Sequence, residues 1–114
     1  MNKLAQNLGI INKNINKNSQ GRAITLIAVS KTFNSYMVKQ AISLGLMIFG
    51  ENKVQECSLK FENILIEYPN IQLHMVGPLQ RNKVKKALSL FNTIHTLDRE
   101  KIVNEIKKKY FSKF

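Results

Sequence analysis

The chain has 114 residues, enough for one small domain, and 44% of them are hydrophobic. No apolar stretch reaches the length of a membrane span, and residues 1–20 lack the apolar segment of a signal peptide, so we expect no membrane contact. The single cysteine, Cys57, has no partner for an internal disulfide, which is typical of a reducing compartment. We therefore expect a cytoplasmic protein.

The formal net charge of +11 is in the range of nucleic-acid-binding proteins. The lysines are spread along the chain, however, and few aromatic residues lie between them to stack on bases. Asn, Lys and Ile are abundant together, which an AT-rich genome would produce without selection for a basic surface. We expect nucleic acid not to be a partner, and a basic RNA-associated interaction module stays open as an alternative that salt-sensitive binding would favour.

The first half of the chain alternates between helical and strand-like patterns. Apolar residues at helical spacing predict an amphipathic helix over about residues 1–18. The apolar run at residues 24–30 predicts a strand that is covered on both faces, as in parallel sheets. A second helix is capped by Asn34 or Ser35 and ended by Gly45. A short strand at residues 46–49 follows it.

The second half repeats the same alternation. A helix over about residues 53–67 places Cys57 in its apolar stripe, which predicts a core residue rather than a nucleophile. Strands are expected at residues 71–76 and 93–97, with a basic helix at 80–90 between them and a last helix capped by Asp98. Units of about 20 to 25 residues predict the α/β fold class with about four parallel strands, closer to a (β/α) barrel than to a Rossmann sheet.

Polar residues follow the predicted strands, where parallel (β/α) proteins build their sites. Lys31 follows the first strand, Asn52 the second and Asn82 the third, while His74 lies within the third strand. A desolvated lysine amine can form a Schiff base with an aldehyde, although a strand-end lysine is often only a solvated loop residue. The spacing of His74 and His95 matches no metal motif, which favours ordinary satisfied histidines.

Three segments in order resemble the YggS/PROSC family of pyridoxal phosphate homeostasis proteins, which have the alanine-racemase-type barrel. The segments are AVSK at residues 28–31, FGEN with VQE at 49–56, and HMVGPLQRNK at 74–83. The match runs from about residue 24 to residue 106. The resemblance implies a single partial PLP-binding (β/α) barrel domain over residues 1–114, the N-terminal half of a TIM-type barrel.

The resemblance also implies the site. Lys31 is expected to hold pyridoxal 5′-phosphate (PLP) as a Schiff base, with Asn52 beside the cofactor ring and His74 and Asn82 near the pocket. A lysine in a barrel mouth is expected to be partly desolvated, which lowers its pKa. The family binds and buffers PLP without an established reaction, so we do not assign catalysis. A racemase-like enzyme fragment stays open as an alternative, although no tyrosine or cysteine stands at a predicted strand end.

The chain differs from the family pattern chiefly in length, because a full barrel takes roughly 250 residues. In the family, the phosphate is held by groups from the second half of the barrel, so we expect a truncated protein with impaired binding. Two open sheet edges and an uncovered apolar face are expected to favour self-association or pairing with a separately encoded C-terminal half. Phe33, Asn34 and Lys53 also depart from residues common in the family.

Overall fold

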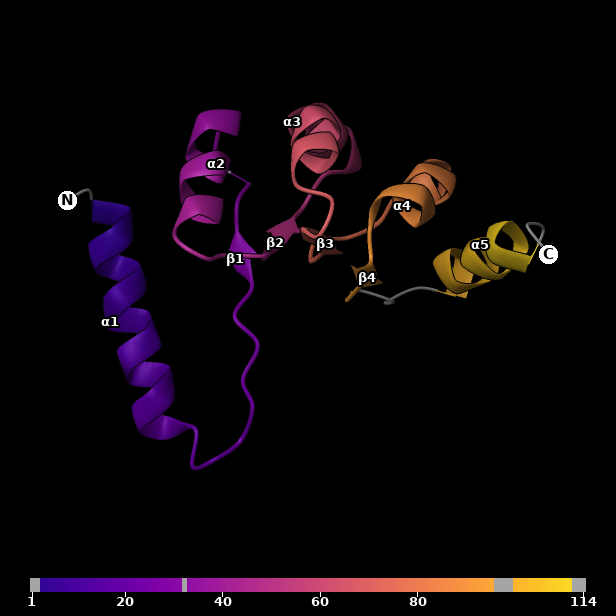
Figure 1. The fold of residues 1–114 in the computed structure, drawn as a ribbon. Helices are drawn as coiled ribbons and strands as arrows, with labels where there is room; N and C mark the ends of the chain where they lie inside the picture. Colours follow the sequence, from indigo (N-terminus) through magenta and orange to yellow (C-terminus); the bar gives the residue numbers. More distant parts are fainter. Residues whose placement is uncertain (1–2, 32, 96–99, 112–114) are drawn as a thin grey trace.

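A computed structural model gives the arrangement of the chain (Figure 1). It describes residues 3–31, 33–95 and 100–111. Of residues 110 and 111 it describes the backbone alone. Its elements, in chain order, are α1 (Lys3–Asn18), β1 (Ala28–Val29), α2 (Ser35–Ser43), β2 (Ile48–Glu51), α3 (Val54–Glu67), β3 (Gln72–Met75), the 3₁₀ turn η1 (Arg81–Lys83), α4 (Val84–Leu90), β4 (Thr93–Ile94) and α5 (Glu100–Phe111).

The described strands form one parallel sheet in the order β1-β2-β3-β4. Neighbours in sequence are neighbours in the sheet, and α2, α3 and α4 connect the strands on one side of it (Figure 1). This is the right order for the first strands of a (β/α) barrel. The predicted fold class, the N-terminal half of a TIM-type barrel, is therefore confirmed.

β1 and β3 are shorter than their apolar patterns predicted, and β2 lies two residues later in the chain than the predicted strand at 46–49. Only Ala28 and Val29 of the run at residues 24–30 pair with β2, and Ile24 is 52% exposed. β2 begins at Ile48, so the earlier part of the run has no partner strand at its level. The fourth strand is expected at residues 93–97, and its last two residues, with Asp98, lie outside the described residues.

The ends of α2 follow the expected capping chemistry. The Asn34 side chain accepts a hydrogen bond from the Met37 amide at 2.8 Å, which satisfies a free N–H group of the first turn. Gly45 has a φ of +95° just after the helix, where the amide of Leu46 donates to the carbonyl of Ala41 at 3.1 Å. Such a left-handed residue ends a helix at little cost only when it is glycine.

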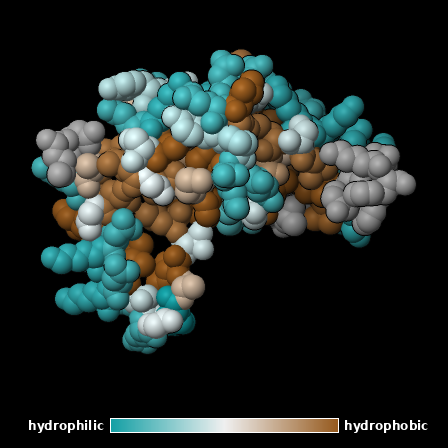
Figure 2. All heavy atoms as spheres, viewed as in Figure 1, coloured by the Kyte–Doolittle hydropathy of each residue, from teal (hydrophilic) through white to brown (hydrophobic). Residues whose placement is uncertain are grey.

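The core lies between the sheet and the helices on one of its faces. Phe49 of β2 packs against Phe61 of α3 with ring centroids 5.6 Å apart, and both are fully buried. Among the described elements, no helix covers the opposite face of the sheet (Figure 1), where Val29 is 50% exposed. Figure 2 shows the apolar residues gathered in the middle of the molecule, bordered by polar outer surfaces.

Helix α1 packs beside β1 and not over the sheet (Figure 1). Its Leu8 is buried, while Ile10 and Ile11 remain exposed. An apolar hollow of about 230 Å³ separates α1 from β1, with Leu4, Leu26 and Val29 in its lining. Within the part of the chain that is described, no helix is both long and apolar enough to cross a membrane.

Candidate functional site

The carboxyl ends of the strands bring the predicted site segments to one edge of the sheet. Val29 pairs with Gly50, and Glu51 pairs with Met75, so β1, β2 and β3 end at similar levels. Lys31 and Asn52 each lie just beyond a strand end, as the sequence predicted from the position of the apolar runs. The edge is therefore the place where side chains from separate (β/α) units can act together.

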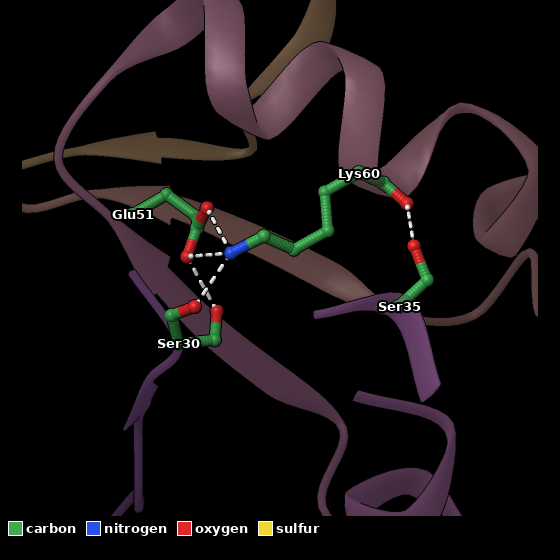
Figure 3. Close-up of polar contacts among 4 residues, drawn as sticks. All are labelled: Ser30, Ser35, Glu51 and Lys60. Atoms are coloured by element: carbon green, nitrogen blue, oxygen red, sulfur yellow. Dashed lines mark hydrogen bonds and ion pairs between the residues drawn. The ribbon is translucent and has the colours of Figure 1, made fainter. Parts of the chain in front are cut away.

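A buried polar network lies just under this edge, on the helix side of the sheet (Figure 3). The Lys60 ammonium donates to both carboxylate oxygens of Glu51, at 2.9 and 3.2 Å, and to the carbonyl oxygen of Ser30 at 2.6 Å. The Ser30 hydroxyl donates to Glu51 Oε2 at 2.6 Å. The network therefore joins the ends of β1 and β2 to the middle of α3.

The network compensates for the burial of two charges. The side chain of Glu51 is 1% exposed and that of Lys60 is 11% exposed. A carboxylate removed from water is tolerated when a countercharge and further hydrogen bonds replace its hydration. Here Glu51 has both, since Lys60 supplies the charge and Ser30 supplies a hydroxyl donor.

Cys57 lies in the core near this network and is buried. Burial, followed by the negative charge of Glu51, raises the pKa of the Cys57 thiol from 9.0 to about 12, while Lys60 acts in the opposite direction. A thiol with such a pKa stays protonated and unreactive near neutral pH. The prediction that Cys57 is a core residue is confirmed.

Lys31 has an exposed side chain. It borders an open hollow of about 390 Å³, together with residues of α2 and α3 that include Ser35, Glu56 and Lys60. The expected partial desolvation of Lys31 is not found, because Lys31 lies in the turn after β1 and the hollow that it borders is open to solvent. The amine is instead freely accessible at the end of β1.

Asn52 is half-buried and lines a different hollow, an open cleft of about 670 Å³ between the segments that follow β2 and β3. Gln80 and Lys83 lie on the other side of this cleft. Gly77 allows the two segments to approach, since a Cβ atom there would lie 2.9 Å from the carbonyl oxygen of Asn52. The position of Asn52 thus depends on a glycine in the segment after β3.

His74 is buried and bonds to His95, with 2.9 Å between Nδ1 of His74 and Nε2 of His95. Burial, and to a lesser extent the neighbouring His95, lowers the pKa of His74 below 6.5. His74 pairs with Gly50 in the sheet, so it lies on the face opposite the helices. In the described part of the chain, no group of three or more His, Cys, Asp or Glu residues could hold a metal ion.

Asn82 is exposed in η1, and the described contacts do not bring it to Lys31. The four predicted residues therefore lie along one edge and its inner face without converging on one cavity. Sequence reasoning missed the Ser30–Glu51–Lys60 network. Its one signal is a glutamate directly after an apolar strand, with Lys60 three positions beyond the core residue Cys57 in the next helix.

Parallel strand–helix units with polar residues at the strand ends define a protein of the (β/α)-barrel class, of which these residues form one part. A pyridoxal phosphate homeostasis protein of Buchnera aphidicola from Acyrthosiphon pisum is 45% identical over 87 residues, covering 76% of this chain and 43% of its own. That of Vibrio alginolyticus is 35% identical, covering 93% and 48%. The chain belongs to the pyridoxal phosphate homeostasis (YggS) family and corresponds to its N-terminal half.

A solved structure agrees with this assignment. PipY of Synechococcus elongatus PCC7942, with PLP bound, has a TM-score of 0.81 and 29% identity, covering 96% of this chain and 49% of PipY. The chain spans about half the length of the curated relatives it matches. No protein-family model matches the chain.

Proposed function

We propose that this protein binds PLP and takes part in PLP homeostasis, with Lys31 as the residue that holds the cofactor. The observation that carries the proposal is the likeness to PipY, a PLP-bound structure that covers 96% of this chain. The relatives named for PLP homeostasis support the physiological role. The lone cysteine supports a cytoplasmic location as part of the same proposal.

The residues present fit part of a PLP site. PLP supplies an aldehyde that can condense with a primary amine, and Lys31 offers an exposed amine at the end of β1. Asn52 offers an amide beside an open cleft, and the exposed Asn82 and the buried His74 lie further along the same edge and on the inner face of the sheet. We propose that Asn52 lies beside the cofactor ring and that His74 and Asn82 lie near the pocket.

The proposal also includes a partner that covers the open face of the sheet. Val29 and Ile24 are about half exposed, and no helix of the described residues covers the face that carries His74. Apolar sheet surface of this kind favours association. A second copy of this chain or a separately supplied C-terminal half would provide the cover, and sedimentation of the protein alone and with that half distinguishes the two.

The first experiment is an absorbance titration with PLP of the wild type, Lys31→Ala and Lys53→Ala. Lys53 is an exposed lysine at the next strand end and serves as the matched control. We expect a new band that survives dialysis in the wild type and in Lys53→Ala and is absent in Lys31→Ala. Borohydride reduction followed by peptide mapping should place the label on Lys31. A band of equal strength in Lys31→Ala would overturn the proposal.

A further inference from the structure

We propose that Lys60 is a positioning residue for the site, acting through the backbone that carries Lys31 and Asn52. Lys60 is not proposed to contact the cofactor. The connection between Lys60 and PLP rests on the proposed function. It holds the ends of two strands in a fixed relation, and the two proposed cofactor-binding residues follow those ends directly.

The Lys60 ammonium is placed to bond groups at two strand ends. A lysine has three N–H donors, and the structure offers three acceptors within 3.2 Å: the carbonyl oxygen of Ser30 and both carboxylate oxygens of Glu51. Ser30 directly follows β1, whereas Glu51 is the last residue of β2. One group on α3 therefore bridges the ends of β1 and β2, as Figure 3 shows.

The positions of the bridged groups are the second argument. Ser30 immediately precedes Lys31, and its carbonyl oxygen also accepts the amide of Phe33 at 2.9 Å, so it shapes the turn that contains Lys31. Glu51 immediately precedes Asn52, and its carbonyl oxygen accepts the amide of Val76 at 3.0 Å. The two residues that Lys60 bonds are thereby also joined by their carbonyl oxygens to the turn after β1 and to the residue that follows β3.

The choice of charged residues is the third argument. Apolar side chains of similar volume often stabilise a core as well as a buried ion pair does. An apolar side chain at position 60 could not bond a carbonyl oxygen and a carboxylate at the same time. The buried Lys60 is already engaged as a donor, whereas the exposed Lys31 is accessible, so the two lysines have separate tasks.

The experiment compares the full chain with three variants. The double variant Glu51→Gln/Lys60→Met removes the bridge without leaving an isolated buried charge. Lys60→Arg keeps a cationic donor. Lys39→Met is the matched control, since Lys39 makes an exposed ion pair with Glu67 at 3.2 Å between α2 and α3.

The first readout is amide hydrogen exchange in the absence of PLP. We expect the amides of Phe33 and Val76 to exchange at least about tenfold faster in the double variant, the size expected for lost charged hydrogen bonds. The amide of Leu46, at the end of α2, serves as the internal reference and should stay unchanged. A purely structural role would speed all three amides alike, and that result, or no change at all, would overturn the inference.

The second readout is the PLP dissociation constant from the Lys31-dependent band. We expect it to rise at least about tenfold in the double variant, to recover in Lys60→Arg and to stay unchanged in Lys39→Met. Equal constants in the wild type and the double variant would refute the positioning role. If the wild type forms no band, the proposed function fails on its own, while the exchange measurement still decides whether Lys60 fixes the strand ends.

Discussion

The two faces of the sheet are built from alternating residues of the same strands, yet they follow different chemistry. Ser30 and Glu51 point to the helix side and are essentially inaccessible, whereas Val29 on the other face is 50% exposed. The helix side buries Phe49 and pairs the buried carboxylate of Glu51 with Lys60. The helix-covered face therefore contributes most of the buried core, whereas the other face keeps apolar surface open to solvent.

The same contrast appears between the two polar clusters. The network of Ser30, Glu51 and Lys60 combines a positive and a negative charge with a hydroxyl donor. The pair of His74 and His95 joins two bases, so a second proton would create like charges at 2.9 Å. The network is therefore suited to a permanent structural role. The histidine pair, in contrast, would be destabilised if both rings were protonated.

The largest difference between the faces should appear on truncation of apolar residues. Phe61→Ala removes a fully buried ring and should lower the free energy of unfolding by about 3–5 kcal/mol. Val29→Ala removes two methyl groups from a half-exposed side chain and should cost about 1 kcal/mol or less. Urea unfolding of both variants measures the contrast, and equal losses would mean that the open face is covered in solution.

Breaking the buried ion pair should have an effect of similar size. Glu51→Ala leaves the ammonium of Lys60 buried without a carboxylate and should cost about 3–5 kcal/mol. Glu67→Ala removes the partner of Lys39 on the exposed surface and should cost about 1 kcal/mol at most. Chemical denaturation measures both losses. Similar losses in the two variants would mean that water reaches Glu51 freely.

A smaller effect is expected where the two strand-end segments meet. Gly77→Ala would place a Cβ atom 2.9 Å from the backbone oxygen of Asn52, which should cost about 1–3 kcal/mol and weaken PLP binding. Gly9→Ala is the control, since a Cβ atom at this position of α1 meets nothing within 4 Å. This substitution should raise the free energy of unfolding by about 0.5–1 kcal/mol. Thermal unfolding and PLP titration test the pair, and a neutral Gly77→Ala would show that the segments can separate without loss.

The smallest effect is a pH dependence that originates on the open face. The pKa of His74 is lowered from 6.5 by burial and by His95, so below pH 6.5 the unfolded chain binds more protons than the folded chain. The free energy of unfolding should therefore fall as the pH falls through this window, by at most about 1.4 kcal/mol per pH unit from this group. His74→Gln should flatten this part of the profile in urea unfolding between pH 8 and pH 5. An unchanged slope would assign the effect to other groups.

Much of the fold could be predicted because its signals are local. The alternation of strand and helix patterns, the Asn34 cap and the Gly45 end all depend on residues close in sequence. Strand lengths could not be predicted as well, since apolar residues report burial while pairing needs a neighbour at the same level. Residues 24–27 are all apolar or β-branched, and yet they lie outside the paired strand.

The candidate site divides in the same way. The order of elements was enough to place Lys31 and Asn52 at strand ends, but the exposure of Lys31 depends on how openly the turn after β1 lies beside α2 and α3. The contact between His74 and His95 joins residues 21 positions apart, and its sequence spacing suggested no relation.

The parallel (β/α) order, the two ends of α2 and the family resemblance could be read from the sequence, because periodicity and short motifs are local along the chain. Only the tertiary structure decided that Lys60 bridges the ends of β1 and β2 and that His74 faces the open side. Those facts depend on the register of neighbouring strands and on the rotation of α3 against them. A shift of one residue in strand register would turn the strand side chains to the other face of the sheet.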